Sequence, residues 1–396
     1  MRRVRSGLDR WIADGPSICG LAAGARLGVV AHPASVDANA SHIVEVLLAS
    51  RIYRLQRLFA PEHGLWGHEQ DMEAVREAVD PWSGLPVVSL YGTDRDSLRP
   101  RPEHLSGLDA IVVDLQDVGS RYYTFVYTLS YVMETAGEAG LPVIVLDRPN
   151  PIGGRSAEGP VLDPALASFV GRYPLPIRHG MTIGELAKLF CDTFGVSCDL
   201  RVVEMEGWRR AMEFDETGLP WVPPSPNMPS FATVRVYPGG CLVEGTNLSE
   251  GRGTTTPFEL VGAPWLDGRE LAARLSAERL PGVLFRATSF RPMFQKHAGT
   301  ACGGVQVIVS DAASFRPVQS YLALLREARS VDLRQFEWRT ETYEFETERP
   351  AVDYLLGLDG LREMIERGAA LSEMEQSWSE GLATFLEIRD RHLLYS

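Results

Sequence analysis

The sequence lacks any apolar run that approaches the roughly 18 residues of a membrane-spanning helix. It also lacks the apolar core of a signal peptide behind its basic first residues, Met1 to Arg10. Positive charge is in deficit, because 39 Lys and Arg face 52 Asp and Glu, which gives a formal net charge of −13. Phosphate contacts need basic surface, so nucleic acid and acidic membranes are disfavoured as partners. We therefore expect a cytoplasmic protein that binds neither nucleic acid nor membrane.

Cysteine is scarce, and motifs of cofactor chemistry are missing. The five cysteines are odd in number and include no CxxC pair, which favours reduced, mostly buried thiols over a disulfide framework. No GxGxxG follows the first expected strand, and GxxxxGKS/T, HExxH and GxSxG do not occur. We therefore expect no nucleotide cofactor, no metal and no serine nucleophile.

The sequence does contain apolar strands that alternate with helical segments. After a lead-in helix and turn over 1–26, strands are expected at 27–31, 55–62, 86–91, 108–115 and 142–146, with helices at 41–50, 95–105 and 122–139. This alternation is typical of an α/β fold with a doubly wound parallel sheet. The length of 396 residues suggests two domains or three, and the texture changes near residue 155.

The second part of the chain is less regular. Thr182 and Glu185 form a capping-box pattern at the start of a helix over 181–194. A proline-rich segment at 221–230 and a glycine-rich polar run at 237–259 are expected to be irregular. The remaining expected elements are strands at 200–203 and 305–309, helices at 315–328 and 352–366, and a C-terminal helix that ends near residue 392.

Polar side chains follow the carboxyl ends of several expected strands. In an open α/β sheet, ligands bind in the crevice beyond these ends. Each such residue taken alone is typical of a cap or a turn, but their convergence at one edge predicts a site. The residues are His32, Glu62, Asp114, Asp117, Asp147 and Asn150.

The most informative strand end is Phe59-Ala60-Pro61-Glu62-His63-Gly64. Pro61 cannot continue the sheet ladder, Gly64 frees the backbone to turn, and Trp66 offers a flat apolar surface nearby. Glycosidic cleavage needs a carboxylic acid that protonates the leaving oxygen and a second group at the anomeric centre. Partial desolvation suits Glu62 to the acid role. The second group is not fixed by the sequence, since Glu250, Glu244, Asp114 and Asp117 all qualify by type.

Five stretches together resemble the bacterial exo-β-N-acetylmuramidases, a NamZ-type glycoside hydrolase family long described as a domain of unknown function. They occur in family order and span roughly residues 25 to 395. The stretches are Phe59-Ala60-Pro61-Glu62-His63-Gly64, Asp114-Leu115-Gln116-Asp117-Val118-Gly119-Ser120-Arg121-Tyr122-Tyr123-Thr124, Leu146-Asp147-Arg148-Pro149-Asn150-Pro151, Pro224-Ser225-Pro226-Asn227-Met228-Pro229, and Glu244-Gly245-Thr246-Asn247 through Gly251-Arg252-Gly253-Thr254.

This resemblance implies a Rossmann-like domain at 1–160 and a smaller α+β domain at 161–396 that forms the other wall of a cleft. It implies release of N-acetylmuramic acid from the non-reducing ends of peptidoglycan fragments, in cell-wall turnover and without a cofactor. Glu62 maps to the glutamate of the Pro-Glu-His-Gly motif and is the predicted catalytic residue, with Glu250 as the second carboxylate. The predicted substrate contacts are His63, Asp114, Gln116, Asp117, Arg121, Tyr122, Arg148, Asn150, Asn227, Glu244, Asn247, Arg252 and Thr254.

N-acetylmuramic acid carries a lactyl carboxylate, which an acidic protein can hold only with local cations. Arg121, Arg148 and Arg252 are the candidates. Two other functions stay open. One is a metal-dependent hydrolase that uses His63, His68 and neighbouring acids, and the other is a non-catalytic muropeptide-binding module. The stereochemical outcome, participation of the substrate acetamido group, and the choice between monomer and homodimer are not decided by the sequence.

Overall fold

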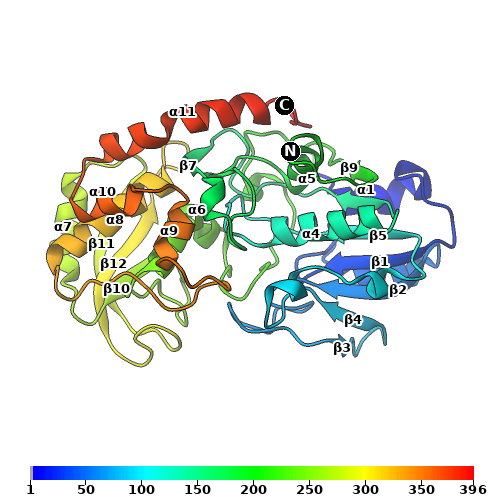
Figure 1. The fold of residues 1–396 in the computed structure, drawn as a ribbon, viewed down its shortest axis with the longest axis horizontal. Coiled ribbons are helices and arrows are strands. Elements are labelled where there is room, and N and C mark those ends of the chain that lie inside the picture. The colour runs from blue at the N-terminus through cyan, green and yellow to red at the C-terminus, as the bar shows by residue number, and fades with distance from the viewer. Residues whose placement is uncertain (1–2) are drawn as a thin grey trace.

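The structure is a computed structural model that describes residues 3–396. Its first half is built on a seven-stranded sheet of order β3-β4-β2-β1-β5-β6-β9 (Figure 1). All neighbouring strands are parallel except β3, which pairs antiparallel with β4. The strands are β1 (Arg26–Ala31), β2 (Arg54–Ala60), β3 (Ala78–Val79), β4 (Pro86–Ser89), β5 (Ala110–Asp114), β6 (Val143–Leu146) and β9 (Leu200–Val203). The predicted α/β class and parallel sheet are confirmed.

The central strands are mostly apolar because helices and loops cover the sheet. Every residue of β5 and β6 is buried, as expected for parallel strands without a solvent face. Gly7 allows α1 to approach the sheet closely, since a Cβ there would lie 2.4 Å from the backbone nitrogen of Asp147. The helices of this half are α1 (Gly7–Asp14), α2 (Ile43–Ser50), α3 (Pro102–Leu105), α4 (Phe125–Glu138) and α5 (Ile183–Asp192).

The second half is a smaller α+β unit. Its antiparallel sheet has the order β10-β12-β11, and a separate pair joins β7 to β8. The strands are β7 (Glu158–Val161), β8 (Pro176–Arg178), β10 (Leu260–Ala263), β11 (Val283–Phe290) and β12 (Cys302–Val309). The helices are α6 (Phe231–Gly240), α7 (Gly268–Ala277), α8 (Pro317–Val331), α9 (Ala351–Leu356), α10 (Leu361–Glu366) and α11 (Leu371–Arg389).

The two halves are joined closely. Helix α11 leaves the second half and runs back across the molecule, so that the C-terminus lies near the start of the chain (Figure 1). One continuous core includes buried side chains from both halves. Strand β9 completes the first sheet although it lies beyond residue 160. We propose that the sheet domain extends past the predicted boundary at residue 160 to include β9.

Local structure differs from expectation mainly where proline and glycine occur. The capping box of Thr182 and Glu185 is confirmed at α5. The expected helix over 95–105 is divided into a 3₁₀ helix, η2 (Arg95–Leu98), and the single turn α3, because prolines at 100 and 102 interrupt it. The glycine-rich run expected to be irregular from 237 starts inside α6 and continues in the 3₁₀ helix η5 (Cys241–Gly245).

Two further differences lie near the chain ends. The expected helix over 352–366 is two helices, because Gly357 and Gly360 adopt positive φ between α9 and α10. The lead-in helix is limited to α1, followed by the 3₁₀ helix η1 (Pro16–Ile18), and residues 1 and 2 lie outside the described chain. The remaining 3₁₀ helices are η3 (Pro164–Leu166) and η4 (Phe214–Glu216). Over residues 3–396, no helix combines the length and the apolar character needed to cross a bilayer.

Candidate active site

Two adjoining cavities lie between loops of the two halves. The inner pocket, of about 40 Å³, is lined among others by Glu62, His63, Tyr122, Asn227, Arg252 and Glu344. The outer cavity, of about 570 Å³, is lined among others by Asn247, Glu250, Lys296, Trp338 and Arg339. Asp71 and Glu244 line both, so the two cavities share a wall.

Glu62 reaches the inner pocket because the chain turns sharply after β2. His63 and Gly64 both have positive φ, at 69° and 81°, which directs the loop back across the sheet edge. The Glu62 side chain is buried, and its Oε2 accepts a 2.7 Å hydrogen bond from the Thr124 hydroxyl. Thr124 directly precedes α4, so the Glu62 carboxylate lies near the amino end of a helix.

His63 is also fixed in place. Its Nδ1 lies 3.0 Å from the carbonyl oxygen of Glu69, and its ring meets the edge of Phe125. The imidazole therefore lines the inner pocket with one nitrogen engaged by backbone.

Arg252 joins the inner pocket to the outer cavity through three carboxylates. Its guanidinium lies 3.0 Å from Asp71, 2.6 Å from Glu244 and 3.0 Å from Glu250. Burial raises the pKa of Glu244, although Arg252 opposes the rise. Burial acts in the same direction on Glu250, but Lys296 at 2.9 Å and Arg252 outweigh it, so the pKa of Glu250 is lowered. Both Glu250 oxygens are thus held by cations, which makes it a fixed, ionised wall residue.

A buried carboxyl that the sequence analysis did not identify lines the inner pocket with Glu62. This is Glu344, whose Oε2 accepts a 2.9 Å hydrogen bond from the hydroxyl of Tyr91. Burial raises the pKa of Glu344 well above its ordinary value, and the charge of Glu62 adds to the rise. It belongs to an acidic run at 341–348 that reads as a solvated loop. Only the interleaved aromatic residues Tyr343 and Phe345 signal that part of the run is buried.

Two of the three arginines expected at the substrate carboxylate lie outside both cavities. Arg121 is fully buried and donates to the carbonyl oxygens of Pro160, Leu175 and Leu355. Arg148 makes a bidentate pair with Asp114, at 2.5 and 2.7 Å. The prediction that these groups contact substrate is not supported by their positions, because each guanidinium lies outside both cavities and holds other parts of the fold.

Four other predicted contacts also stabilise turns. The Gln116 amide donates to the carbonyl oxygens of Asp117 and Pro149, at 2.7 and 2.9 Å. The Asn150 amide donates to Met181 at 2.9 Å, Asp117 accepts from the Gly119 N–H at 2.7 Å, and Thr254 donates to Gly251 at 2.6 Å. Strand-end residues therefore divide into those that reach the cleft and those that hold the loops.

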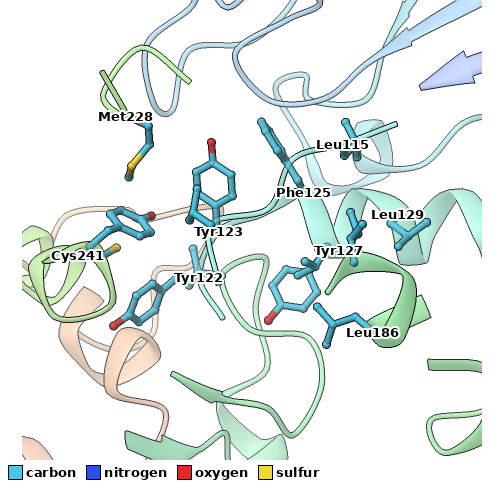
Figure 2. Close-up of a cluster of buried hydrophobic side chains, with 14 of the residues drawn as sticks. Leu115, Tyr122, Tyr123, Phe125, Tyr127, Leu129, Leu186, Met228 and Cys241 are labelled. Atoms are coloured by element: carbon cyan, nitrogen blue, oxygen red, sulfur yellow. The ribbon is translucent and has the colours of Figure 1, made fainter. Parts of the chain in front are cut away.

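The other predicted residues do come together. Glu62, His63, Tyr122, Asn227, Glu244 and Arg252 line the inner pocket, whereas Asn247 and Glu250 line only the outer cavity. Figure 2 shows the successive residues Tyr122 and Tyr123 directed to opposite sides of their backbone. The Tyr122 hydroxyl donates to the Pro238 carbonyl, so its ring forms part of the pocket wall while its polar end is engaged.

Within residues 3–396, no set of three or more His, Cys, Asp or Glu side chains is placed to hold a metal ion. His63 and its neighbouring acids thus form no ligand cluster there. The arrangement is instead a small pocket with two buried carboxyl groups and a buried ion network, which is suited to acid-base chemistry on a polar substrate.

Comparisons with known proteins agree along the whole chain. Two family models match: "Exo-beta-N-acetylmuramidase NamZ, N-terminal" at residues 27–232 and "Exo-beta-N-acetylmuramidase NamZ, C-terminal" at residues 235–395. The chain is 44% identical over 393 residues to the peptidoglycan beta-N-acetylmuramidase NamZ of Bacillus subtilis (strain 168), covering 99% of this chain and 92% of that protein.

Solved structures are similar as well. Crystal structures of two DUF1343 family proteins from Bacteroides fragilis NCTC 9343 match with TM-scores of 0.88 and 0.76. The first is 30% identical and covers 100% of both chains, and the second is 26% identical and covers 99% of both.

Proposed function

Because the chain belongs to the NamZ exo-β-N-acetylmuramidase family, we propose that it hydrolyses the β-glycosidic bond of terminal N-acetylmuramic acid. Its substrates are the non-reducing ends of peptidoglycan fragments produced in cell-wall turnover. The observation that carries this proposal is the inner pocket, where buried Glu62 and residues of the second half form one small polar site. The outer cavity of about 570 Å³ adjoins this pocket and has room for a sugar residue, whereas the inner pocket of about 40 Å³ does not.

Glu62 is the catalytic carboxyl that the family resemblance predicts. Hydrolysis of a glycosidic bond needs two groups, one that protonates the departing oxygen and one that stabilises or attacks the anomeric carbon. Glu62 is buried in the inner pocket and held by Thr124, so its position is fixed before substrate binds. Glu250 is a weaker candidate for the second role, because Arg252 and Lys296 hold both of its oxygens in the wall of the outer cavity.

The direct test is incubation with the disaccharide of N-acetylmuramic acid β-1,4-linked to N-acetylglucosamine, with the product anomers followed by NMR. We expect free N-acetylmuramic acid, and we expect Glu62→Gln to lower kcat at least a hundredfold. Glu45→Gln, an exposed change on α2, is the matched control. Near-normal turnover by Glu62→Gln would contradict the assignment. Binding of the disaccharide without any product would instead indicate a muropeptide-binding module.

The metal-dependent alternative has its own test. Activity that survives dialysis against EDTA supports the metal-free proposal, whereas loss in EDTA with recovery on added zinc or manganese would overturn it.

We further propose a reducing, cytoplasmic location and a monomer or homodimer. The thiols of Cys191 and Cys198 support the location, because their sulfur atoms lie 3.8 Å apart without a disulfide bond between them. Cell fractionation and light scattering test these two proposals.

A further inference from the structure

Glu344 occupies an unusual position in the chain. The backbone groups of Tyr343 and Glu346 exchange hydrogen bonds of 3.0 and 2.8 Å, so Glu344 and Phe345 are the two central residues of a tight turn. Both have positive φ, at 46° and 70°. Asn-Gly or a similar pair is the usual choice for such a turn, because bulky side chains are strained there. A glutamate and a phenylalanine at these positions indicate that side-chain contacts, and not the turn alone, hold this strained backbone in place.

The turn directs both side chains into the protein. Phe345 packs against Tyr91 and Phe169, with ring centres 5.8 and 6.4 Å apart. Glu344 is 5% exposed and lines the inner pocket beside Glu62, with its Oε2 bonded to the hydroxyl of Tyr91. The aromatic packing therefore acts as a rigid support that holds the Glu344 carboxyl in the pocket.

Glu344 also differs from the other buried acids in its charge environment. Arg252 forms salt bridges to Glu244 and Glu250, and Lys296 forms another salt bridge to Glu250. Within residues 3–396, Glu344 makes no salt bridge to a cation. The groups that face it electrostatically are Glu62 after β2, Tyr91 after β4, Asp71 and Glu244. Burial among acids and without a cation favours the protonated form of a carboxyl group.

We propose that Glu344 is the general acid of the hydrolysis, and that Glu62 is its ionised partner facing the anomeric carbon. This inference rests on the proposed function and reverses the sequence-based role of Glu62 as proton donor. Environments that push two carboxyl groups apart in protonation are typical of glycosidase pairs. Glu62 lies at the amino end of α4, where the Thr124 hydroxyl donates a hydrogen bond to its carboxyl group. Glu344 also accepts a hydrogen bond, from the Tyr91 hydroxyl, but burial outweighs this bond and raises the pKa of Glu344.

The step balances with the pair holding one proton. Glu344 gives its carboxyl proton to the glycosidic oxygen as the bond from that oxygen to C1 breaks, and the bonding electrons leave with the departing sugar. The negative charge of Glu62 stabilises the positive charge at C1. A water molecule supplies the oxygen of the new bond to C1, and the proton that this water releases returns the pair to its one-proton state.

The test compares two substrates that differ in their need for an acid. Cleavage of the N-acetylmuramic acid disaccharide needs protonation of a sugar hydroxyl, whereas a 4-nitrophenyl leaving group departs without it. We expect Glu344→Gln to lower kcat/KM for the disaccharide at least a hundredfold and for the 4-nitrophenyl glycoside less than tenfold. The decline of kcat/KM at alkaline pH should disappear from the pH profile of Glu344→Gln. Glu62→Gln should lose activity on both substrates, and the exposed loop change Glu348→Gln should alter neither.

Tyr91→Phe supplies a second readout that does not remove a carboxyl. The Tyr91 hydrogen bond lowers the pKa of Glu344, so its loss should move the alkaline limb to higher pH while the fold is kept. Equal losses on both substrates in Glu344→Gln, full activity in that variant, or an unmoved limb in Tyr91→Phe would each overturn the inference. Wild-type cleavage of the disaccharide together with any of these results leaves the proposed function standing. Failure of the wild-type protein to cleave either substrate removes both proposals.

Discussion

Replacing Arg252 with methionine removes the one cation that Asp71, Glu244 and Glu250 share, while retaining an apolar side chain of similar length. Two of the carboxylates keep a partner. Glu250 retains Lys296 at 2.9 Å, and Asp71 retains the Gln295 amide at 2.5 Å and is partly exposed. Of the partners that Glu244 has within residues 3–396, the Tyr343 hydroxyl remains, at 2.7 Å. The loss of stability should therefore fall mainly on Glu244.

The magnitude follows from the proton that Glu244 must take up. Burial already raises the pKa of Glu244, and removal of Arg252 takes away the largest opposing influence. If the folded variant holds this group neutral, the cost is about 1.4 kcal/mol for each pH unit above the ordinary pKa of 4.5. The ceiling is thus about 3.4 kcal/mol at pH 7 and about 0.7 kcal/mol at pH 5. The sign is that of a raised carboxyl pKa, so the destabilisation grows with pH.

Urea unfolding at pH 5, 6 and 7 measures this dependence. The control is Arg274→Met, which breaks an exposed pair with Glu270 on α7 and should cost less than about 1 kcal/mol at every pH. A loss for Arg252→Met that does not change with pH would refute the reasoning. So would a loss below about 1 kcal/mol at pH 7, because water would then be solvating Glu244 in the empty space.

Three further predictions concern Asp147, Thr124 beside Glu62, and Arg339 in the wall of the outer cavity. Burial raises the pKa of Asp147 to about 7, so its contribution to stability is full below its ordinary pKa and lost as pH rises to about 7; Asp147→Asn should flatten this slope in urea unfolding. Thr124→Val removes the 2.7 Å hydrogen bond to Glu62, and steady-state kinetics should show kcat reduced about ten- to a hundredfold with little change in KM. Arg339 lines the outer cavity, and its side-chain contacts to Met72 and Thr342 are as long as 3.5 Å. If it binds the lactyl carboxylate, Arg339→Gln should raise KM about tenfold for the acid and leave KM unchanged for an analogue reduced to the alcohol.

Short-range signals in the sequence were reliable where local physics decides the outcome. The apolar runs near 27–31, 108–115 and 142–146 form buried parallel strands, because such runs are stable only when covered on both faces. Pro61 and Gly64 do end a strand and turn the chain, and this places Glu62 and His63 at the sheet edge. The motif resemblance also identified the family correctly.

The sequence could not distinguish residues that bind substrate from residues that stabilise the fold. Asp114 and Arg148 follow strands just as Glu62 does, yet they satisfy each other in a bidentate pair. The competition between a substrate and an internal partner is decided by distance, and distance depends on contacts between separate segments, which for Asp114 and Arg148 are 34 residues apart. Glu344 was missed for the converse reason, because an acidic run is normally solvated and only the packing of Phe345 turns one of its carboxyls inward.

Residue order alone thus determined the α/β class, the turn at Glu62 and the family to which the chain belongs. The folded molecule decided which charges neutralise one another. It engages Arg121 and Arg148 in structural contacts, surrounds Arg252 with three carboxylates, and leaves Glu344 among acids. A buried charge takes its properties from its nearest neighbours in space, and for Arg121 and Glu344 distant parts of the chain supply those neighbours.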